Sequence, residues 1–360
     1  MKILFVASDP GGSRALIPII DACEERDLHP VVVDHGYLGK EVNDVVMKIN
    51  AQEFINYEHF KNSQSRHAYS VLCFGTSLTD KIPLRIVSNA KKIDIPTICI
   101  LDNWMNYKHR LCLYKDCYIW PDVYAVMDEY AKIKAIEEGI PEETIKVTGH
   151  PAFSNILDIH QEVQRIDSSN NIHVKNKKHI VFVSEPVEHD NLNAASEKLK
   201  RNYTEKDVLK ILYDKCKLLS EKLSISILPH PREDINSLKS YISEIGGTAD
   251  DVVIDSHNRK IIDSADGVIG MTSILLYESW LKGKPTLSLQ PGLVRDDLNI
   301  FEDREGVFCI NNFNTQQNIF DEWINKVLYL ENITPRKDAL IHNLSIDSIF
   351  NNMSKLAYKK

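Results

Sequence analysis

The sequence lacks the features of a membrane-spanning, fibrous or nucleic-acid-binding protein. No stretch approaches the ~18 uninterrupted apolar residues that a membrane-spanning helix requires. The 14 glycines and 14 prolines are too few for a collagenous or low-complexity chain. Basic residues number 43 against 51 acidic ones, so the net charge is −8, and no basic stripe is present to attract a phosphate backbone. We therefore expect a small-molecule partner and no nucleic acid.

The sequence contains few cysteines, and their spacing indicates neither disulfide pairs nor a metal site. The seven cysteines are odd in number and scattered, and Cys112 and Cys117 do not form a CxxC pair. We therefore expect reduced thiols in a cytoplasmic protein without a metal site. The opening residues MKILFVASDPGG contain a short apolar run without a small-residue cleavage site, so we interpret them as a buried first strand rather than a signal peptide.

The sequence does contain a repeated pattern of strand, loop and helix. Its 360 residues predict about two domains at roughly 150 residues each. Short apolar runs alternate with helically spaced apolar residues, which is typical of parallel sheets covered by helices. The strands predicted in the first half are 3–7, 30–33, 70–74, 95–101, 123–127 and 145–147. Those predicted in the second half are 179–183, 225–228, 252–254, 267–269, 286–289 and 306–310.

A polar stretch, IDSSNNIHVKNKK, separates the two halves. We predict an α/β fold of two Rossmann-like, doubly wound domains that face a cleft. The first domain covers 1–155, a linker covers 156–178, and the second domain covers 179–334. The tail, 335–360, has the apolar spacing of a helix.

The strand predicted at 267–269 leads into residues suited to bind a diphosphate. Ligands of open α/β sheets bind beyond the carboxyl ends of the strands, at helix N-termini. After Gly270, Thr272 and Ser273 supply hydroxyl groups and cap the next helix, whose first amides attract an anion. Glu278 lies one to two turns further on and is placed to accept hydrogen bonds from a ribose diol. The alternative is an ordinary capped helix with an exposed glutamate.

Two other strand ends of the second half carry polar side chains. His230 lies between two prolines that fix the backbone, so its imidazole can be held near a phosphate or a leaving group. Ser184 and Glu185 directly follow the strand predicted at 179–183 and are placed to face a phosphate or a sugar. A simple turn explains either segment equally well.

The first half offers two candidate carboxylates. Gly11 and Gly12 form a loop that lets a ligand approach the backbone, and Asp9 is available to act on it, although the loop matches neither GxGxxG nor GxxxxGK[ST]. Asp102 opens the segment DNWMNY, which mixes a carboxylate, amides and aromatic rings, a combination that binds sugars. A surface loop with a buried Trp104 is the alternative.

The chain resembles the GT-B superfamily of nucleotide-sugar enzymes. The resemblance lies in MKILFVASDPGGSRAL, IKVTGHPAF, LPHPRED and IIDSADGVIGMTSILLYESWLKGKPTLSLQPG. It points to the bacterial surface-polysaccharide branch, near nucleotide-sugar 2-epimerases, lipid A disaccharide synthases and glycerophosphotransferase-like enzymes. It implies that the second domain binds the nucleotide sugar, that the first faces the acceptor, and that the C-terminal helix packs back on the first domain.

The resemblance also implies roles for individual residues. It places the donor diphosphate at Met271, Thr272 and Ser273 and the ribose at Glu278. It places His230 at a phosphate or leaving group, and the acceptor-side base at the first-loop carboxylate or at the start of DNWMNY. The Gly-Gly that precedes the ribose-binding glutamate in epimerases is replaced by Met271 and Thr272, a departure that favours transfer over epimerisation.

Our leading hypothesis is a metal-independent glycosyltransferase for a bacterial surface glycan, such as capsule or lipopolysaccharide. Asp9 or Asp102 would take the proton of the acceptor hydroxyl, and the helix N-terminus with His230 would stabilise the departing nucleotide diphosphate. The partners are then a nucleotide-sugar donor and a glycan or lipid-linked acceptor, with no cofactor. The alternatives are a nucleotide-sugar 2-epimerase or hydrolase, and a non-catalytic nucleotide-sugar-binding subunit. The sequence leaves peripheral membrane contact and a homodimer open.

Overall fold

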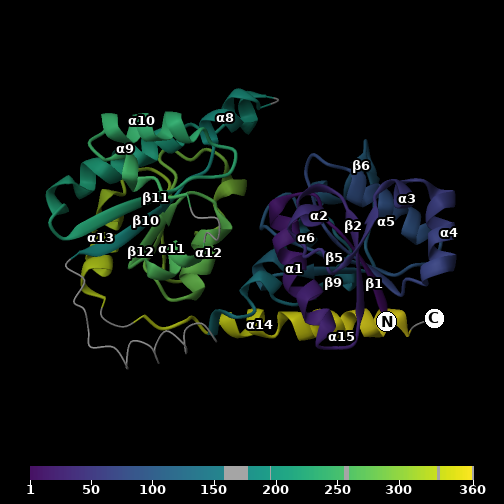
Figure 1. The fold of residues 1–360 in the computed structure, drawn as a ribbon. Coiled ribbons are helices and arrows are strands. Elements are labelled where there is room, and N and C mark those ends of the chain that lie inside the picture. The colour runs from purple at the N-terminus through teal and green to yellow at the C-terminus, as the bar shows by residue number, and fades with distance from the viewer. Residues whose placement is uncertain (158–176, 195, 255–258, 331–332, 359–360) are drawn as a thin grey trace. The chain divides into compact units, whose positions relative to one another are not determined.

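The computed structural model describes residues 1–157, 177–194, 196–254, 259–330 and 333–358, which fold into two compact units. The N-terminal unit comprises Met1–Leu157 together with Asp338–Lys360, and the C-terminal unit comprises Asp158–Lys337. Each unit contains a parallel sheet with helices packed against it (Figure 1). Most of the linker predicted at 156–178 lies outside the described residues.

The N-terminal unit is built on a parallel sheet with the strand order β3-β2-β1-β4-β5-β8-β9. This order places the topological switch point between β1 and β4, where connections leave in opposite directions. The strands are β1 (Lys2–Val6), β2 (His29–Asp34), β3 (Met47–Asn50), β4 (Val71–Gly75), β5 (Thr97–Ile100), β8 (Val123–Val126) and β9 (Ile145–Val147). A separate antiparallel hairpin joins β6 (Cys112–Tyr114) to β7 (Cys117–Tyr118).

Helices cover this sheet because their apolar residues face it. Helix α1, for example, buries Ala15, Leu16, Ile19 and Cys23 in the same core as Ile3 and Phe5 of β1. The helices are α1 (Pro10–Glu24), α2 (Gly36–Glu41), α3 (Gln52–Ile55), α4 (Tyr57–His67), α5 (Ile82–Lys92), α6 (Glu129–Glu137), α14 (Ala339–Asn343) and α15 (Ser345–Ala357).

The last helix belongs to the first core. In α15, Ile349, Phe350 and Met353 are buried against the N-terminal core, and Arg26 Nη2 of the segment after α1 lies 2.6 Å from Asp347 Oδ1. Figure 1 shows α15 running alongside the elements that begin the chain. The N-terminal core is therefore formed by residues from both parts of the N-terminal unit, 1–157 and 338–358.

The C-terminal unit repeats this architecture with the strand order β11-β10-β12-β13-β14, all parallel, and its switch point lies between β10 and β12. The strands are β10 (Lys178–Val183), β11 (Leu223–Leu228), β12 (Gly267–Gly270), β13 (Thr286–Leu289) and β14 (Val307–Ile310). The helices are α8 (Val187–Leu192), α9 (Glu205–Cys216), α10 (Ile235–Glu244), α11 (Arg259–Ser264), α12 (Ile274–Leu281) and α13 (Gln317–Tyr329).

The predicted α/β class with two Rossmann-like sheets is confirmed, and two local predictions are wrong. Residues 252–254 form no strand. Val252 makes a single bridge to Ile227, and Ile254 is exposed. Gly11 and Gly12 do not form a loop either, because helix α1 begins at Pro10, whose fixed φ suits the first helical turn.

Candidate functional site

Helix α1 meets strand β4 at the switch point of the N-terminal sheet, and two glycines make this approach possible. A Cβ atom on Gly12 would lie 3.2 Å from the Cα of Gly75, and one on Gly75 would lie 2.8 Å from the Cα of Gly12. Both positions are therefore closed to larger residues. The contact brings the residues before α1 next to those after β4 at the carboxyl edge of the sheet.

Asp102 follows β5 at this edge and is held by Arg110. The Arg110 Nη1 donates to Asp102 Oδ1 at 2.8 Å and to Thr76 Oγ1 at 3.1 Å, and both charged side chains are buried. Asp102 Oδ2 lies against the start of α1, since a Cβ on Gly11 would come within 2.2 Å of it. Gly11 thus makes room for a side chain of this protein.

Asp9 is the N-cap residue of α1, but its side chain makes no capping hydrogen bond. Burial raises the pKa of the Asp9 carboxyl, and the negative charges of Asp102 and Asp80 act in the same direction. A hydrogen bond with Ser77 and the charge of Arg110 oppose the rise without cancelling it. Asp9 therefore holds a proton more firmly than an ordinary aspartate does.

A histidine–carboxylate pair joins this cluster. His35 Nε2, after β2, lies 2.5 Å from Asp80 Oδ2, and Asp80 Oδ1 accepts a hydrogen bond from the Ile82 amide at 2.8 Å. Burial alone would raise the pKa of Asp80, but the hydrogen bonds from Ile82 and His35 outweigh it and lower the pKa. We call Asp9, His35, Asp80, Asp102 and Arg110 the acidic cluster.

At the carboxyl edge of the C-terminal sheet, Glu185 contacts the residue predicted to bind a diphosphate. Its Oε1 accepts a hydrogen bond from the Thr272 amide at 2.5 Å, and its Oε2 accepts one from Thr272 Oγ1 at 2.5 Å. Arg201 completes the group, with Nη2 3.3 Å from Thr272 Oγ1 and Nη1 3.5 Å from Glu185 Oε2. The amide therefore already binds a carboxylate of this chain.

His230 and Ser184 are linked through a residue that the sequence did not single out. Glu233 Oε1 accepts a hydrogen bond from Ser184 Oγ at 2.6 Å, and its Oε2 accepts one from the His230 amide at 2.5 Å. The ring of His230 also accepts the Arg232 amide at Nδ1, at 3.1 Å. Burial raises the pKa of Glu233. The carboxyl group of Glu233 thus accepts hydrogen bonds from the segments that follow both β10 and β11.

Glu278 lies within α12, is only 3% exposed, and forms an ion pair. Lys282 Nζ donates to Glu278 Oε1 and to Asp263 Oδ1, each at 2.6 Å. Burial lowers the pKa of Lys282, but the charges of Glu278 and Asp263 outweigh it and raise that pKa. The exposed glutamate of the simpler interpretation is therefore not found, and one carboxylate oxygen is engaged with Lys282.

The other predicted residues of this edge have local structural roles. Gly270 ends β12 close to the Val183 carbonyl, and the Met271 side chain is fully buried in the core. Ser273 caps α12, since its Oγ accepts a hydrogen bond from the Leu275 amide at 3.3 Å. Whether their backbone amides bind a diphosphate stays a prediction, as do the roles assigned to Glu278 and His230.

Sequence reasoning missed His35, Asp80, Arg110 and Arg201. His35 lies two residues beyond the strand predicted at 30–33, so it carried the signal used for the other candidates. Arg110 and Arg201 lie in long connections, and only the folded chain brings them to Asp102 and Thr272.

No helix among the described residues is long and apolar enough to cross a membrane. No three or more histidine, cysteine, aspartate or glutamate side chains among them are grouped so that they would hold a metal ion.

Comparisons with known proteins identify the fold. No model of a known protein family matches the sequence, and no curated protein matches it. The solved UDP-GlcNAc 2-epimerase from Methanocaldococcus jannaschii is similar over 99% of this chain and 100% of its own, with 13% identity and a TM-score of 0.64. The UDP-GlcNAc 2-epimerase from Neisseria meningitidis, solved with bound UDP-GlcNAc, is similar over 99% of this chain and 100% of its own, with 13% identity and a TM-score of 0.62. MurG from Acinetobacter baumannii is similar over 98% of this chain and 99% of its own, with 10% identity and a TM-score of 0.54. The predicted resemblance to the GT-B superfamily is confirmed for the fold.

Proposed function

We propose that this protein is a nucleotide-sugar enzyme that acts as a 2-epimerase on a UDP-sugar. The observation that carries the proposal is the acidic cluster at the carboxyl edge of the N-terminal sheet, in a fold shared over its full length with UDP-GlcNAc 2-epimerases. Our hypothesis from the sequence ranked glycosyl transfer first, and the comparisons favour the epimerase alternative over it.

The reaction needs two proton-handling groups. One group takes the proton from C2 of the sugar as the bond between C1 and the diphosphate oxygen breaks, which releases UDP and leaves a double bond between C1 and C2. When UDP adds back to C1, a second group returns a proton to the opposite face of C2. Neighbouring groups whose pKa values are shifted in opposite directions suit this division.

The acidic cluster supplies such groups. Asp9, with its raised pKa, is the group that gives and takes the proton at one face, and the Asp80–His35 pair serves the other. Asp102 stays fixed by Arg110 and adds the negative charge that helps Asp9 to keep its proton. In the C-terminal unit, the Thr272 amide and Arg201 are the groups that would bind the diphosphate.

The test is to incubate the purified protein with UDP-GlcNAc in heavy water containing EDTA and to follow C2 by NMR. We expect deuterium at C2 and a second C2 epimer without any acceptor. Asp9→Asn should abolish the exchange, and Asp21→Asn, an exposed carboxylate change on the same helix, should not. The proposal fails if no UDP-sugar raises the melting temperature and none is turned over.

A glycosyltransferase is the second candidate. It is favoured by Met271 and Thr272 at the position of the Gly-Gly expected in epimerases, and by the similarity to MurG. In that case UDP would be released only after a glycan or lipid-linked acceptor is added, and C2 would retain its hydrogen in heavy water.

A further inference from the structure

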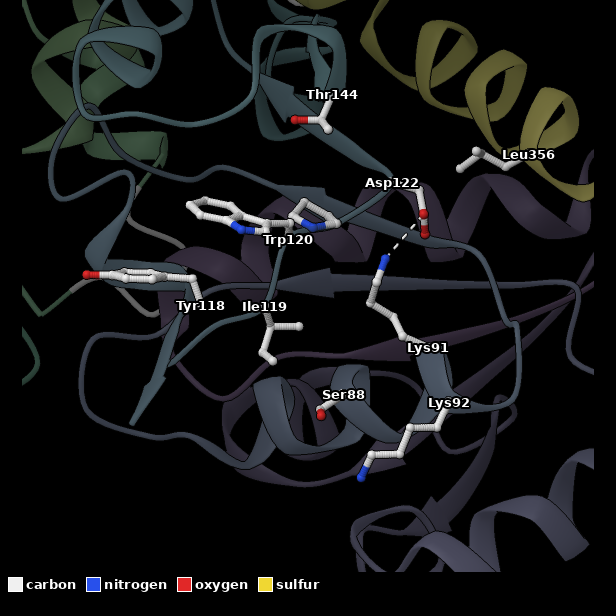
Figure 2. Close-up of a pocket in the computed structure, with 10 residues that line it drawn as sticks. Ser88, Lys91, Lys92, Tyr118, Ile119, Trp120, Asp122, Thr144 and Leu356 are labelled. Carbon is white, nitrogen blue, oxygen red and sulfur yellow. Dashed lines mark hydrogen bonds and ion pairs between the residues drawn. The ribbon is translucent and has the colours of Figure 1, made fainter. Parts of the chain in front are cut away.

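The N-terminal unit has a second candidate site, a pocket drawn in Figure 2, whose residue Asp122 lies at the amino edge of the sheet, whereas the acidic cluster lies at the carboxyl edge. The volume of the pocket is about 600 Å³, within the range of roughly 300–1,000 Å³ of small-molecule sites. The pocket is formed by the second half of α5, by Tyr118 of β7 and the segment that follows it, by Thr144 just before β9, and by Leu356 of α15. Asp122, on its wall, bonds to Thr97 at the amino end of β5, whereas Asp102 follows the carboxyl end of that strand. Four strand residues, about 13 Å, separate the two edges.

Two stacked aromatic rings form one wall of the pocket. The rings of Tyr118 and Trp120 lie with their centroids 5.5 Å apart and their planes within 15° of each other. Figure 2 shows both rings beside Ile119 at the same pocket. The C–H bonds on one face of a sugar ring carry slight positive charge and pack against the negative face of an aromatic ring. The wall therefore matches a sugar ring better than a flexible acyl chain.

A fixed ion pair provides polar groups beside this wall. Asp122 Oδ2 accepts hydrogen bonds from the amide and the hydroxyl of Thr97, at 2.8 and 2.7 Å, and its Oδ1 lies 3.2 Å from Lys91 Nζ. A sugar hydroxyl donates and accepts at once, so one hydroxyl beside this pair can donate to the carboxylate and accept from the ammonium group. The charge of Lys91 is balanced by Asp122, so this ion pair suits a neutral ligand better than an anion. Lys92, the other cation of the lining, donates to Asn89 Oδ1 at 3.2 Å and lies over the Tyr57 ring.

We propose that this pocket is a carbohydrate-binding site that holds a neutral sugar of a glycan chain and does no chemistry on it. The sugar stacks on Trp120 and Tyr118, and its hydroxyl groups bind Asp122 and Lys91. Its distance from the acidic cluster means that the bound sugar is not the one that reacts. The site is independent of the reaction proposed above.

The test is a titration of the full chain with the β-1,4-linked trimers of glucose and of N-acetylglucosamine, followed by saturation-transfer NMR and calorimetry. We expect at least one trimer to bind saturably in the presence of excess UDP. Trp120→Ala should weaken that binding at least tenfold. Tyr114→Ala is the matched control. Tyr114 is an exposed aromatic residue on the β6–β7 hairpin that also carries Tyr118, but it lies outside the pocket. The Tyr114→Ala variant should therefore bind the trimer as the wild type does.

Three results would overturn the proposal: no saturable binding of either trimer, equal binding by Trp120→Ala, or displacement of the trimer by UDP. If Trp120→Ala melts early, two milder variants replace it. Trp120→Phe keeps an aromatic face and should lose less affinity than the alanine variant, and Lys91→Met removes the donor and should weaken binding several-fold. Unchanged affinity in both would equally refute the site.

Discussion

The carboxyl edges of the two sheets are built alike but differ in how their charges are satisfied. In the N-terminal unit, Asp9 and its acidic neighbours are crowded together, and Asp9 holds its proton firmly because burial and like charges oppose its ionisation. In the C-terminal unit, the Thr272 amide already binds the carboxylate of Glu185, and Arg201 balances the charge. One edge thus crowds carboxyl groups together, and the other pairs its carboxylate with an amide and an arginine. Under the function proposed above, the first would move protons and the second would exchange one anion for another.

The largest effect is expected from removing the proton-holding group. Asp9→Asn should lower kcat by about 10²–10⁴-fold, because the amide cannot take or give a proton, while the Kd for UDP changes little. Steady-state kinetics and calorimetry measure the two quantities, with Asp21→Asn as the control. Equal losses in kcat and UDP affinity would show that Asp9 binds nucleotide instead.

Lys282→Met tests how far the C-terminal edge depends on its buried ion pair. The variant leaves Glu278 buried without its cation, and removing one partner of such a pair costs about 3–5 kcal/mol. Urea denaturation should show this loss of unfolding free energy. The double variant Lys282→Met with Glu278→Gln should recover part of it, and a single variant as stable as the wild type would contradict the ion pair.

Gly11→Ala should displace Asp102 from Arg110. The added methyl group would lie 2.2 Å from Asp102 Oδ2, and overpacking of this kind costs about 1–3 kcal/mol. Alanine improves helix propensity by about 1 kcal/mol, which does not offset the clash. Thermal melting and turnover should both fall, whereas Arg14→Ala, an exposed change in the same helix, should leave both unchanged.

Glu185→Gln should tighten UDP binding about tenfold, or 1.4 kcal/mol. The diphosphate competes with the Glu185 carboxylate for the Thr272 amide, and the neutral amide side chain is a weaker competitor. Glu188→Gln is the matched control, since it also removes one carboxylate charge, here from a half-buried pair between Glu188 and Lys206 of α9. Weaker UDP binding by Glu185→Gln would mean that Glu185 supports the ligand rather than competes with it.

The smallest effect concerns pH and stability. Because burial raises the pKa of Asp9 above its ordinary 3.8, the folded state binds the Asp9 proton more tightly than the unfolded state does. The stability contributed by this group is therefore present at low pH and is lost as pH rises from 3.8 through the raised pKa. Asp9→Asn should melt higher than the wild type at pH 7, and the difference should disappear below pH 3.8. A constant difference across this range would show that ionisation is not its cause.

The sequence predicted most strands because most of them are continuous apolar runs that the fold buries on both faces. Strand β3 was missed because Met47–Asn50 is only partly buried and its composition resembles a turn. Residues 252–254 were apolar enough to predict a strand, but only Val252 is buried, where it makes one bridge to Ile227, and Ile254 is exposed.

The candidate site was predictable only in part, for a different reason. Residues that follow strands, such as Asp9 and Thr272, could be found because parallel strands bring their carboxyl ends to one edge. Their partners Arg110 and Arg201 could not, since long-range side-chain pairing decides where they lie. No pattern in the sequence predicts that the Glu185 carboxylate accepts a hydrogen bond from the Thr272 amide.

The contribution of α15 to the first core affects the order in which the protein is made. The C-terminal unit is inserted between the two parts of the N-terminal unit, so a ribosome synthesises all of 158–337 before the segment with Ile349, Phe350 and Met353 emerges. Until then the nascent N-terminal sheet exposes the apolar surface that α15 will cover, and the inserted unit can reach its native state first. A stop codon before α15 would leave that surface permanently uncovered and favour aggregation of the truncated product.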